Sequence, residues 1–74
     1  MTRERLPMAI VKIIELIGES PHGWEEAMRE VVAEAQKTLR GITRIGVKEF
    51  DVRLRDDKIQ LFRVRAEVSF RLER

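Results

Sequence analysis

The feature that most constrains the fold is a strict alternation of apolar and polar residues near the end of the sequence. Between residues 62 and 72, every second residue is apolar and the residues between them are charged or polar. The apolar set is Phe62, Val64, Ala66, Val68, Phe70 and Leu72. A period of two places alternate side chains on opposite sides of a β-strand. Residues 59–73 are therefore predicted to form a long antiparallel strand with one face in the core.

Two further segments have the composition of strands. Residues 42–55 come just before the strand predicted over residues 59–73. Asp56, Asp57 and Lys58 lie between the two segments, and a short polar turn of this kind is typical of a β-hairpin. Residues 8–18 are rich in β-branched residues and end at Gly18. Both alternating faces of this segment are apolar, Ile10, Ile14 and Leu16 on one and Val11, Ile13 and Ile17 on the other. A strand that is apolar on both faces is normally covered on both, so we expect something besides the chain's own helix to cover the second face.

Residues 23–41 carry apolar side chains at three- and four-residue spacing, which indicates an amphipathic helix. The apolar stripe is Trp24, Ala27, Met28, Val31, Ala35, Thr38 and Leu39. Ser20 or Gly23 would cap its start, and we prefer Gly23 because Glu26 then lies at the third helical position and can bond back to the start. Gly41 would end the helix in a left-handed conformation. The predicted fold class is α+β, in the order β-α-β-β, with a three-stranded antiparallel sheet packed on one helix.

The length of the chain predicts one domain with a small core. Its 74 residues include no cysteine, so no disulfide can stabilise the fold. Residues 1–7 are expected to form a short flexible extension, and residues 8–74 the single domain. Because a core of this size contributes only about 3–5 kcal/mol, oligomerisation is the remaining means of stabilisation.

Charge and side-chain chemistry argue against several classes of function. The formal net charge is +2, and the charges alternate without forming a basic cluster, so we expect no nucleic-acid partner. Lys12 and Glu15 interrupt the N-terminal apolar stretch, which is too short for a membrane span, and we expect a cytoplasmic protein without a membrane partner. His22 is interpreted as an exposed loop residue. With no cysteine or tyrosine, and no spacing that brings a base to a hydroxyl, the chain is not expected to be an enzyme.

Trp24 is the only tryptophan in the chain and begins the apolar stripe of the predicted helix. An aromatic side chain of this size is either a platform on which a flat ligand stacks or a contact that seats a helix. Because Trp24 continues the helical stripe, we expect it to seat the helix on the sheet or on a neighbouring subunit.

Four segments have a distinctive joint order and spacing: AIVKIIELIGESPHGWEEAM, AEAQKTLRGI, VKEF and FRVRAEVSFRLE. Together they resemble the dodecin family, over nearly the whole chain from Ala9 to Glu73. Dodecins are small β-α-β-β proteins that assemble as hollow dodecamers and commonly bind flavins. The resemblance therefore implies a homododecamer with a small-molecule ligand in pockets between subunits. Neighbouring subunits of such a dodecamer would also cover the second apolar face of residues 8–18.

The resemblance implies four ligand-binding positions. In flavin-binding dodecins a Trp near the start of the second strand stacks on the isoalloxazine ring, and a Gln on the third strand bonds its edge. By resemblance the Trp position is occupied by Arg44 and the Gln position by Arg63, so this chain lacks the flavin-stacking Trp. Arg71 matches a common family residue, and Arg65 lies on the same polar face as Arg63.

Two functions stay open at this point. Arginines in place of Trp and Gln favour an anionic group such as a phosphate or carboxylate, although the planar guanidinium of Arg44 can still stack on a ring. The first hypothesis is a cage that binds, stores or buffers FMN, FAD, riboflavin or another anionic molecule. The alternative is a structural or ion-binding cage of the calcium-associated dodecin type, with metal ligands that the sequence does not identify.

Overall fold

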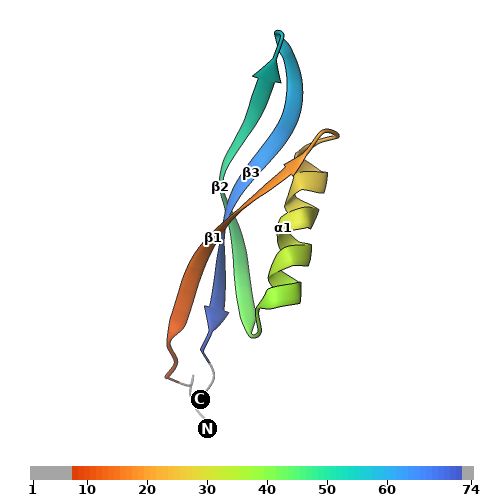
Figure 1. The fold of residues 1–74 in the computed structure, drawn as a ribbon. Helices are drawn as coiled ribbons and strands as arrows, with labels where there is room; N and C mark the ends of the chain where they lie inside the picture. The colour runs from red at the N-terminus through yellow and green to blue at the C-terminus, as the bar shows by residue number, and fades with distance from the viewer. Residues whose placement is uncertain (1–7, 73–74) are drawn as a thin grey trace, which may run out of the picture.

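A computed structural model describes residues 8–72, and its elements follow the predicted order (Figure 1). They are β1 (Val11–Ser20), α1 (Trp24–Thr38), β2 (Ile42–Arg55) and β3 (Lys58–Arg71). The predicted extension, residues 1–7, lies outside the described residues. No helix in the described part of the chain is long and apolar enough to cross a membrane.

The three strands form one antiparallel sheet in the order β1-β3-β2, so the strand with the strictest alternation is central. Helix α1 covers one side of this sheet, which we call the inner face, and leaves the opposite side, the outer face, exposed (Figure 1). The core consists of three helix and three β3 residues: Ala27, Val31, Ala35, Val64, Ala66 and Val68. The β-α-β-β order and the three-stranded antiparallel sheet are confirmed.

Strand β1 approaches α1 most closely at Gly18. A Cβ atom on Gly18 would lie 2.1 Å from the carbonyl oxygen of Ala27 and 2.7 Å from Cγ2 of Val31. Only a residue without a side chain allows this approach. The prediction that the strand ends at Gly18 was wrong, because β1 continues to Ser20 and uses the glycine for packing.

The structure agrees with the predicted start of α1 but not with its predicted end. Gly23 is the N-cap as expected, and its carbonyl accepts a hydrogen bond of 3.1 Å from the amide of Ala27. The predicted end at Gly41 was wrong, since the helix ends at Thr38 and Leu39 is extended. Gly41 does adopt a left-handed φ of 71°, but in the following loop, where its carbonyl accepts a 2.9 Å bond from the amide of Arg71.

One member of the predicted stripe lies on the solvent side of the helix. Thr38 is exposed, and its hydroxyl donates to the carbonyl of Glu34 at 3.0 Å. A threonine in the last turn satisfies its hydroxyl locally on the helix backbone, so it does not contribute to the apolar contact with the sheet.

The hairpin between β2 and β3 turns over two residues, one fewer than predicted, because Lys58 already belongs to β3. Asp56 and Asp57 have positive φ angles of 53° and 62°. A two-residue turn with both φ angles positive matches the right-handed twist of the strands, and aspartate tolerates this conformation better than most residues.

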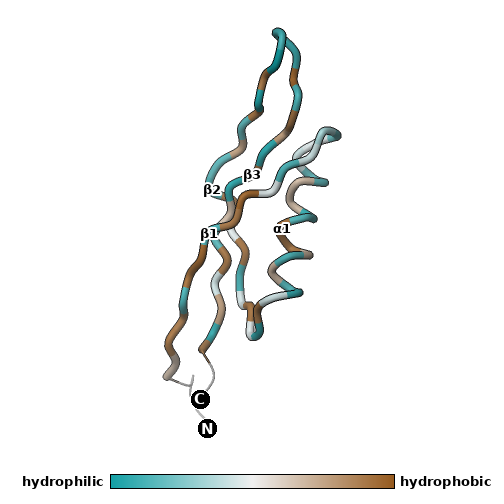
Figure 2. The backbone as a smooth tube through the Cα atoms, viewed as in Figure 1, coloured by the Kyte–Doolittle hydropathy of each residue, from teal (hydrophilic) through white to brown (hydrophobic). Residues whose placement is uncertain are grey.

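The chain is elongated, with a radius of gyration of 16.3 Å and extents of 62 × 26 × 15 Å. A compact chain of this length would have a radius of gyration of about 11 Å. The β2–β3 hairpin projects past the start of α1 (Figure 1), and apolar residues alternate along it and along β1 (Figure 2). Phe50, Leu54 and Ile59 are 52–61% exposed. The single chain therefore leaves much of its apolar surface uncovered.

Candidate functional site

The four sequence-predicted arginines lie on the outer face of the sheet. Arg63, Arg65 and Arg71 alternate along β3 with the buried core residues, so they point away from α1. Arg44 of β2 pairs with Ser69 of β3, which belongs to the same alternating set. Residues directly opposite each other in an antiparallel pair project to the same side. The structure thus brings all four residues onto one face.

Two of the four arginines are held by carboxylates of the neighbouring strands. The Nε atom of Arg63 lies 3.3 Å from a carboxylate oxygen of Glu19 in β1 and 3.8 Å from one of Asp51 in β2. This Nε atom is buried and has no hydrogen-bond partner among residues 8–72. Arg65 lies 3.2 Å from Glu49. The positive charges of Arg63 and Arg65 are therefore largely compensated within the subunit.

The ion-pair partners of these arginines depend on the strand register. Asp51 and Arg63 are Cα partners in the hairpin. Glu49 was missed as the partner of Arg65 because the register shifts between Val47 and Glu49. A bulge that changes the register leaves no reliable signal in an alternating pattern.

The other two arginines lie at the opposite end of the outer face. Arg44 and Arg71 are exposed, and within residues 8–72 neither forms an ion pair. Ile13 pairs with Ser69, the residue opposite Arg44, and Val11 pairs with Arg71. These two β1 side chains are 56% and 50% exposed, respectively. This end of the sheet combines two uncompensated cations with accessible apolar surface, which suits a ligand with an apolar part and an anionic group.

Between the two halves lie two acidic residues. Glu15 of β1 and Glu67 of β3 are Cα partners, and Gly46 of β2 is the Cα partner of Glu67 on its other side. Lys48 lies 3.9 Å from Glu67. Within the described residues of one subunit, no group of three or more His, Cys, Asp or Glu residues is arranged to hold a metal ion.

Trp24 lies on the inner side of the sheet, opposite the arginines. Its indole N–H donates to the carbonyl of Asp51 at 3.0 Å, and its ring packs edge-on against Phe62 at 5.1 Å and Phe50 at 6.0 Å between centroids. Edge-to-face aromatic pairs contribute about 0.5–1.5 kcal/mol beyond their buried area. Of the two predicted contacts, the sheet or a neighbouring subunit, the structure shows the one with the sheet, and Trp24 stays 40% exposed.

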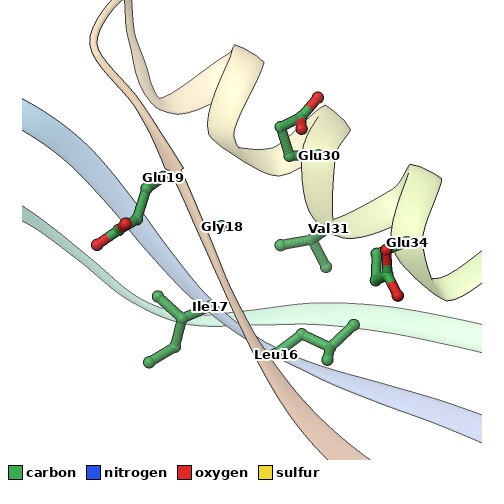
Figure 3. A pocket seen from close by; sticks show the side chains of 7 residues that line it. All are labelled: Leu16, Ile17, Gly18, Glu19, Glu30, Val31 and Glu34. Atoms are coloured by element: carbon green, nitrogen blue, oxygen red, sulfur yellow. The ribbon is translucent and has the colours of Figure 1, made fainter.

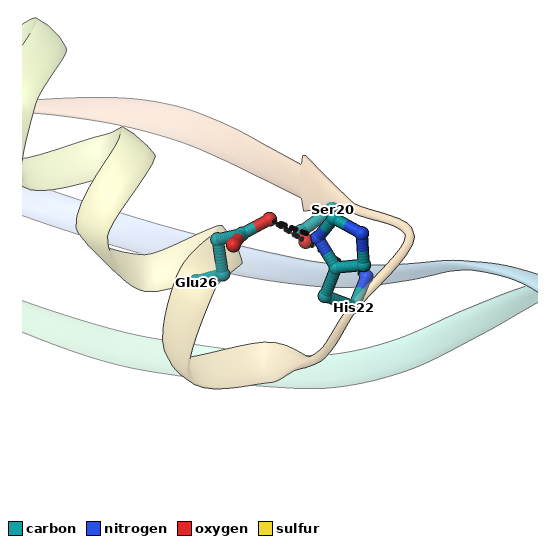
Figure 4. Close-up of polar contacts among 3 residues, drawn as sticks. All are labelled: Ser20, His22 and Glu26. Atoms are coloured by element: carbon teal, nitrogen blue, oxygen red, sulfur yellow. Dashed lines mark hydrogen bonds and ion pairs between the residues drawn. The ribbon is translucent and has the colours of Figure 1, made fainter.

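Three polar residues meet at the start of α1 (Figure 4). Ser20 donates its hydroxyl to Oε1 of Glu26 at 2.5 Å, and Nδ1 of His22 lies 2.8 Å from the same oxygen. The hydrogen bond from Ser20, followed by the contact with His22, lowers the pKa of Glu26. The expectation that Glu26 bonds back to the helix start was wrong, since these partners occupy its carboxylate.

This cluster does not have the geometry of an activated nucleophile. Ser20 is only 2% exposed, and its hydroxyl donates to a carboxylate instead of to the imidazole of His22. Nucleophilic catalysis requires an accessible hydroxyl hydrogen-bonded to a base. His22 itself is 73% exposed in its side chain, as the sequence predicted.

Comparison with known proteins identifies the family. The family model for dodecin matches residues 10–73. The dodecin of Thermus thermophilus is 38% identical over 64 residues, covering 86% of this chain and 93% of that protein. The calcium dodecin of Mycobacterium tuberculosis is 34% identical over 65 residues, covering 88% and 92% of the two chains.

Solved structures agree with the sequence comparisons. The dodecin of Streptomyces coelicolor superposes with a TM-score of 0.86 at 28% identity, over 93% of this chain and 99% of that one. The calcium dodecin of Mycobacterium tuberculosis superposes with a TM-score of 0.78 at 35% identity, over 88% and 93%. Fold, strand order and sequence similarity together show that this chain belongs to the dodecin family.

Proposed function

We propose that the chain is the subunit of a homododecameric cage that binds, and so stores or buffers, a small anionic ligand in pockets between subunits. The observation that carries the proposal is the pair of uncompensated arginines, Arg44 and Arg71, beside the exposed apolar residues of β1. The uncovered outer face and the elongated shape support assembly, because both leave apolar surface that a second subunit would bury.

The residues present favour a ligand with a phosphate over a neutral ring. Arg44 occupies the position where flavin-binding relatives would place an aromatic platform, and a guanidinium can stack on a ring as well as bind an anion. Arg63 is held by Glu19 and Asp51, so it is less available to a ligand than Arg44. Among flavins, FMN and FAD carry phosphate and riboflavin does not, so FMN and FAD match these residues better than riboflavin, and FMN is the simpler probe.

Fluorescence quenching of FMN and riboflavin tests this proposal. We expect FMN to bind more tightly than riboflavin by roughly 10- to 100-fold at low salt, since a hydrogen bond to a charged group contributes about 1.5–3 kcal/mol. The preference should shrink at 1 M salt, where the Debye length is about 3 Å. Arg44→Gln should reduce the FMN preference, while Arg44→Trp should raise the affinity for riboflavin.

Arg53→Gln is the matched control, because Arg53 is an exposed arginine of the same strand, outside the site, without an ion pair in residues 8–72. It should leave both dissociation constants unchanged. Equal affinity of the wild type for FMN and riboflavin, or no quenching of either at micromolar concentration, would contradict the anionic-ligand proposal.

The second candidate function is calcium binding, and one feature of the outer face favours it. Glu15 and Glu67 lie directly opposite each other, where like charges are destabilising. Lys48, 3.9 Å from Glu67, is the cation beside this pair, and Glu15 has no ion-pair partner within residues 8–72. Gly46 leaves open space beside the two glutamates. Several subunits together would supply the six to eight oxygen ligands that calcium takes. Calcium retained after dialysis at a fixed ratio to subunits, measured by elemental analysis and lost in Glu67→Gln, would favour this candidate.

A further inference from the structure

The cavity between β1 and α1 does not suit an anionic ligand. It has a volume of about 290 Å³ and lies at the β1 edge of the sheet (Figure 3). Among the described residues that line it, Glu19, Glu30 and Glu34 carry carboxylates and none is cationic. Because carboxylates repel an anion, the placement of the uncompensated arginines, Arg44 and Arg71, decides where such a ligand binds.

The position of Arg44 depends on an irregularity at the start of β2. Ile42 pairs with Phe70 of β3, and Arg44 pairs with Ser69, so β2 advances by two residues while β3 advances by one. Thr43 is therefore the extra residue of a β-bulge. Bulges change the direction in which the neighbouring side chains point, and they are frequent beside functional sites.

This bulge explains how Arg44 reaches the outer face. Ile42 and Ile45 both pack against the core on the inner face. They are an odd number of residues apart, and in a regular strand such residues point to opposite sides. The extra residue corrects the alternation. Both isoleucines then face the helix, while Arg44, the residue before Ile45, faces the other side of the sheet.

The hydroxyl of Thr43 bonds the bulge to the central strand. It donates at 3.3 Å to the carbonyl of Ser69, the residue opposite Arg44. Close by, the carbonyl of Gly41 accepts a 2.9 Å hydrogen bond from the amide of Arg71. A Cβ atom on Gly41 would lie 3.0 Å from the carbonyl oxygen of Arg71, so the chain passes close to β3 here. The segment that leads into Arg44 is thus bonded to β3 at residues 69 and 71.

These bonds set the spacing of the two cations. Ser69 lies opposite Arg44 and precedes Arg71 by two residues on β3, so Arg44 and Arg71 are diagonal neighbours. Diagonal neighbours in a sheet are about 7–8 Å apart, which is within reach of long side chains. Both guanidinium groups can therefore contact one anionic group. Ordering a binding group before the ligand arrives lowers the cost of binding.

We propose that Thr43 is a positioning residue of the ligand site. Its hydroxyl holds the bulge that presents Arg44 beside Arg71, and it acts on the ligand through Arg44. The inference rests on the proposed anionic-ligand function and adds to that site a residue that makes no contact with the ligand itself.

Two substitutions at position 43 separate the hydroxyl from the shape of the side chain. Thr43→Val keeps the β-branched shape and removes the hydroxyl. It should weaken FMN binding by roughly 3- to 10-fold at low salt, the range that corresponds to one hydrogen bond between neutral groups. Thr43→Ser keeps the hydroxyl and should bind FMN like the wild type. Fluorescence quenching measures the dissociation constants.

Thr38→Val is the matched control. It removes a threonine hydroxyl that bonds the carbonyl of Glu34 on α1, away from the arginines. It should leave the dissociation constant of FMN unchanged. Urea unfolding of each variant checks that it is folded at the concentration used for binding.

A double-mutant cycle with Arg44→Gln tests whether Thr43 acts through the arginine. In the Arg44→Gln background, Thr43→Val should not weaken FMN binding further, so the coupling between the two substitutions should equal the full effect of Thr43→Val. A general loosening of the sheet would instead weaken binding equally in both backgrounds.

Three results would overturn the positioning role: a Thr43→Val variant with the wild-type affinity for FMN, a Thr43→Ser variant that binds as weakly as Thr43→Val, or equal losses with and without Arg44. A wild type that binds FMN no more tightly than riboflavin would instead contradict the proposed function. The two failures are therefore distinguishable.

Discussion

At the scale of single residues, the absence of a side chain at Gly18 sets the distance between helix and sheet. The position contacts the backbone of Ala27 and the side chain of Val31. A backbone carbonyl at 2.1 Å from an added Cβ cannot move aside as the end of a flexible side chain can. Any larger residue at position 18 must push α1 away from β1.

Gly18→Ala should therefore lower the free energy of unfolding by about 1–3 kcal/mol, the usual cost of overpacking a core. Gly46→Ala is the matched control, because an added Cβ there meets nothing within 4 Å. Urea unfolding of both variants at equal protein concentration measures the difference. Equal stability of the two variants would contradict the close packing described at Gly18.

Residue roles were predictable from the sequence where they depend on local pattern. Trp24 belongs to the apolar stripe of the helix, and its contact with the sheet could be predicted from that stripe alone. The compensation of Arg65 by Glu49 was not predictable, because it depends on a bulge in β2. A β-bulge inserts one extra residue into a strand, and the alternation of apolar and polar residues does not show where that residue lies.

At the scale of elements, the start of α1 is held by polar contacts that depend on pH. Ser20 at the end of β1 donates to Glu26 in the first turn, and the amide of His22 donates to the hydroxyl of Ser20 at 2.9 Å. These contacts join strand, loop and helix at one carboxylate. Because they favour its charged form, they lower the pKa of Glu26 below its ordinary value of 4.5.

The sign of the pH dependence follows from this shift. The folded state binds fewer protons at Glu26 than the unfolded state, so this contribution to stability is present above pH 4.5 and is lost as the pH falls through the lowered pKa. Urea unfolding between pH 7 and pH 3 should show a smaller loss of stability on acidification in Glu26→Gln and Ser20→Ala than in the wild type. Thr38→Ala, which removes a hydroxyl bonded to a carbonyl, should lower stability equally at every pH. Parallel pH profiles for all four proteins would contradict the role of Glu26.

The identity and order of the elements were predictable because each carries a clear period, two in β3 and three to four in α1. The helix end was not, since Gly41 can serve either a helix terminus or a loop, and its contact with Arg71 is made only in the folded sheet. The position of β3 between β1 and β2 was not specified either. Alternation reports which face of a strand is buried but not which strands flank it.

At the scale of the whole molecule, the subunit cannot bury its own apolar surface. The side chains of Val11, Ile13 and Ile17 in β1 are 48–56% exposed on the outer face. This exposure is expected if another protein chain covers the second face of the strand. The β2–β3 hairpin adds Leu54 and Ile59, which are 61% and 52% exposed, and the radius of gyration exceeds the compact value by several ångströms. The proposed assembly would account for the elongated shape, the exposed apolar residues and the small core.

Native mass spectrometry of the purified protein tests the central claim most directly, because it counts subunits and retained ligands in one measurement. We expect a species of about 104 kDa, twelve times the 8.7 kDa chain, that gains mass in discrete ligand steps when FMN is added at low salt. Riboflavin at the same concentration should add fewer ligands. A species of 8.7 kDa at neutral pH, or a dodecamer that takes up neither FMN nor calcium, would contradict the account of a ligand-binding cage.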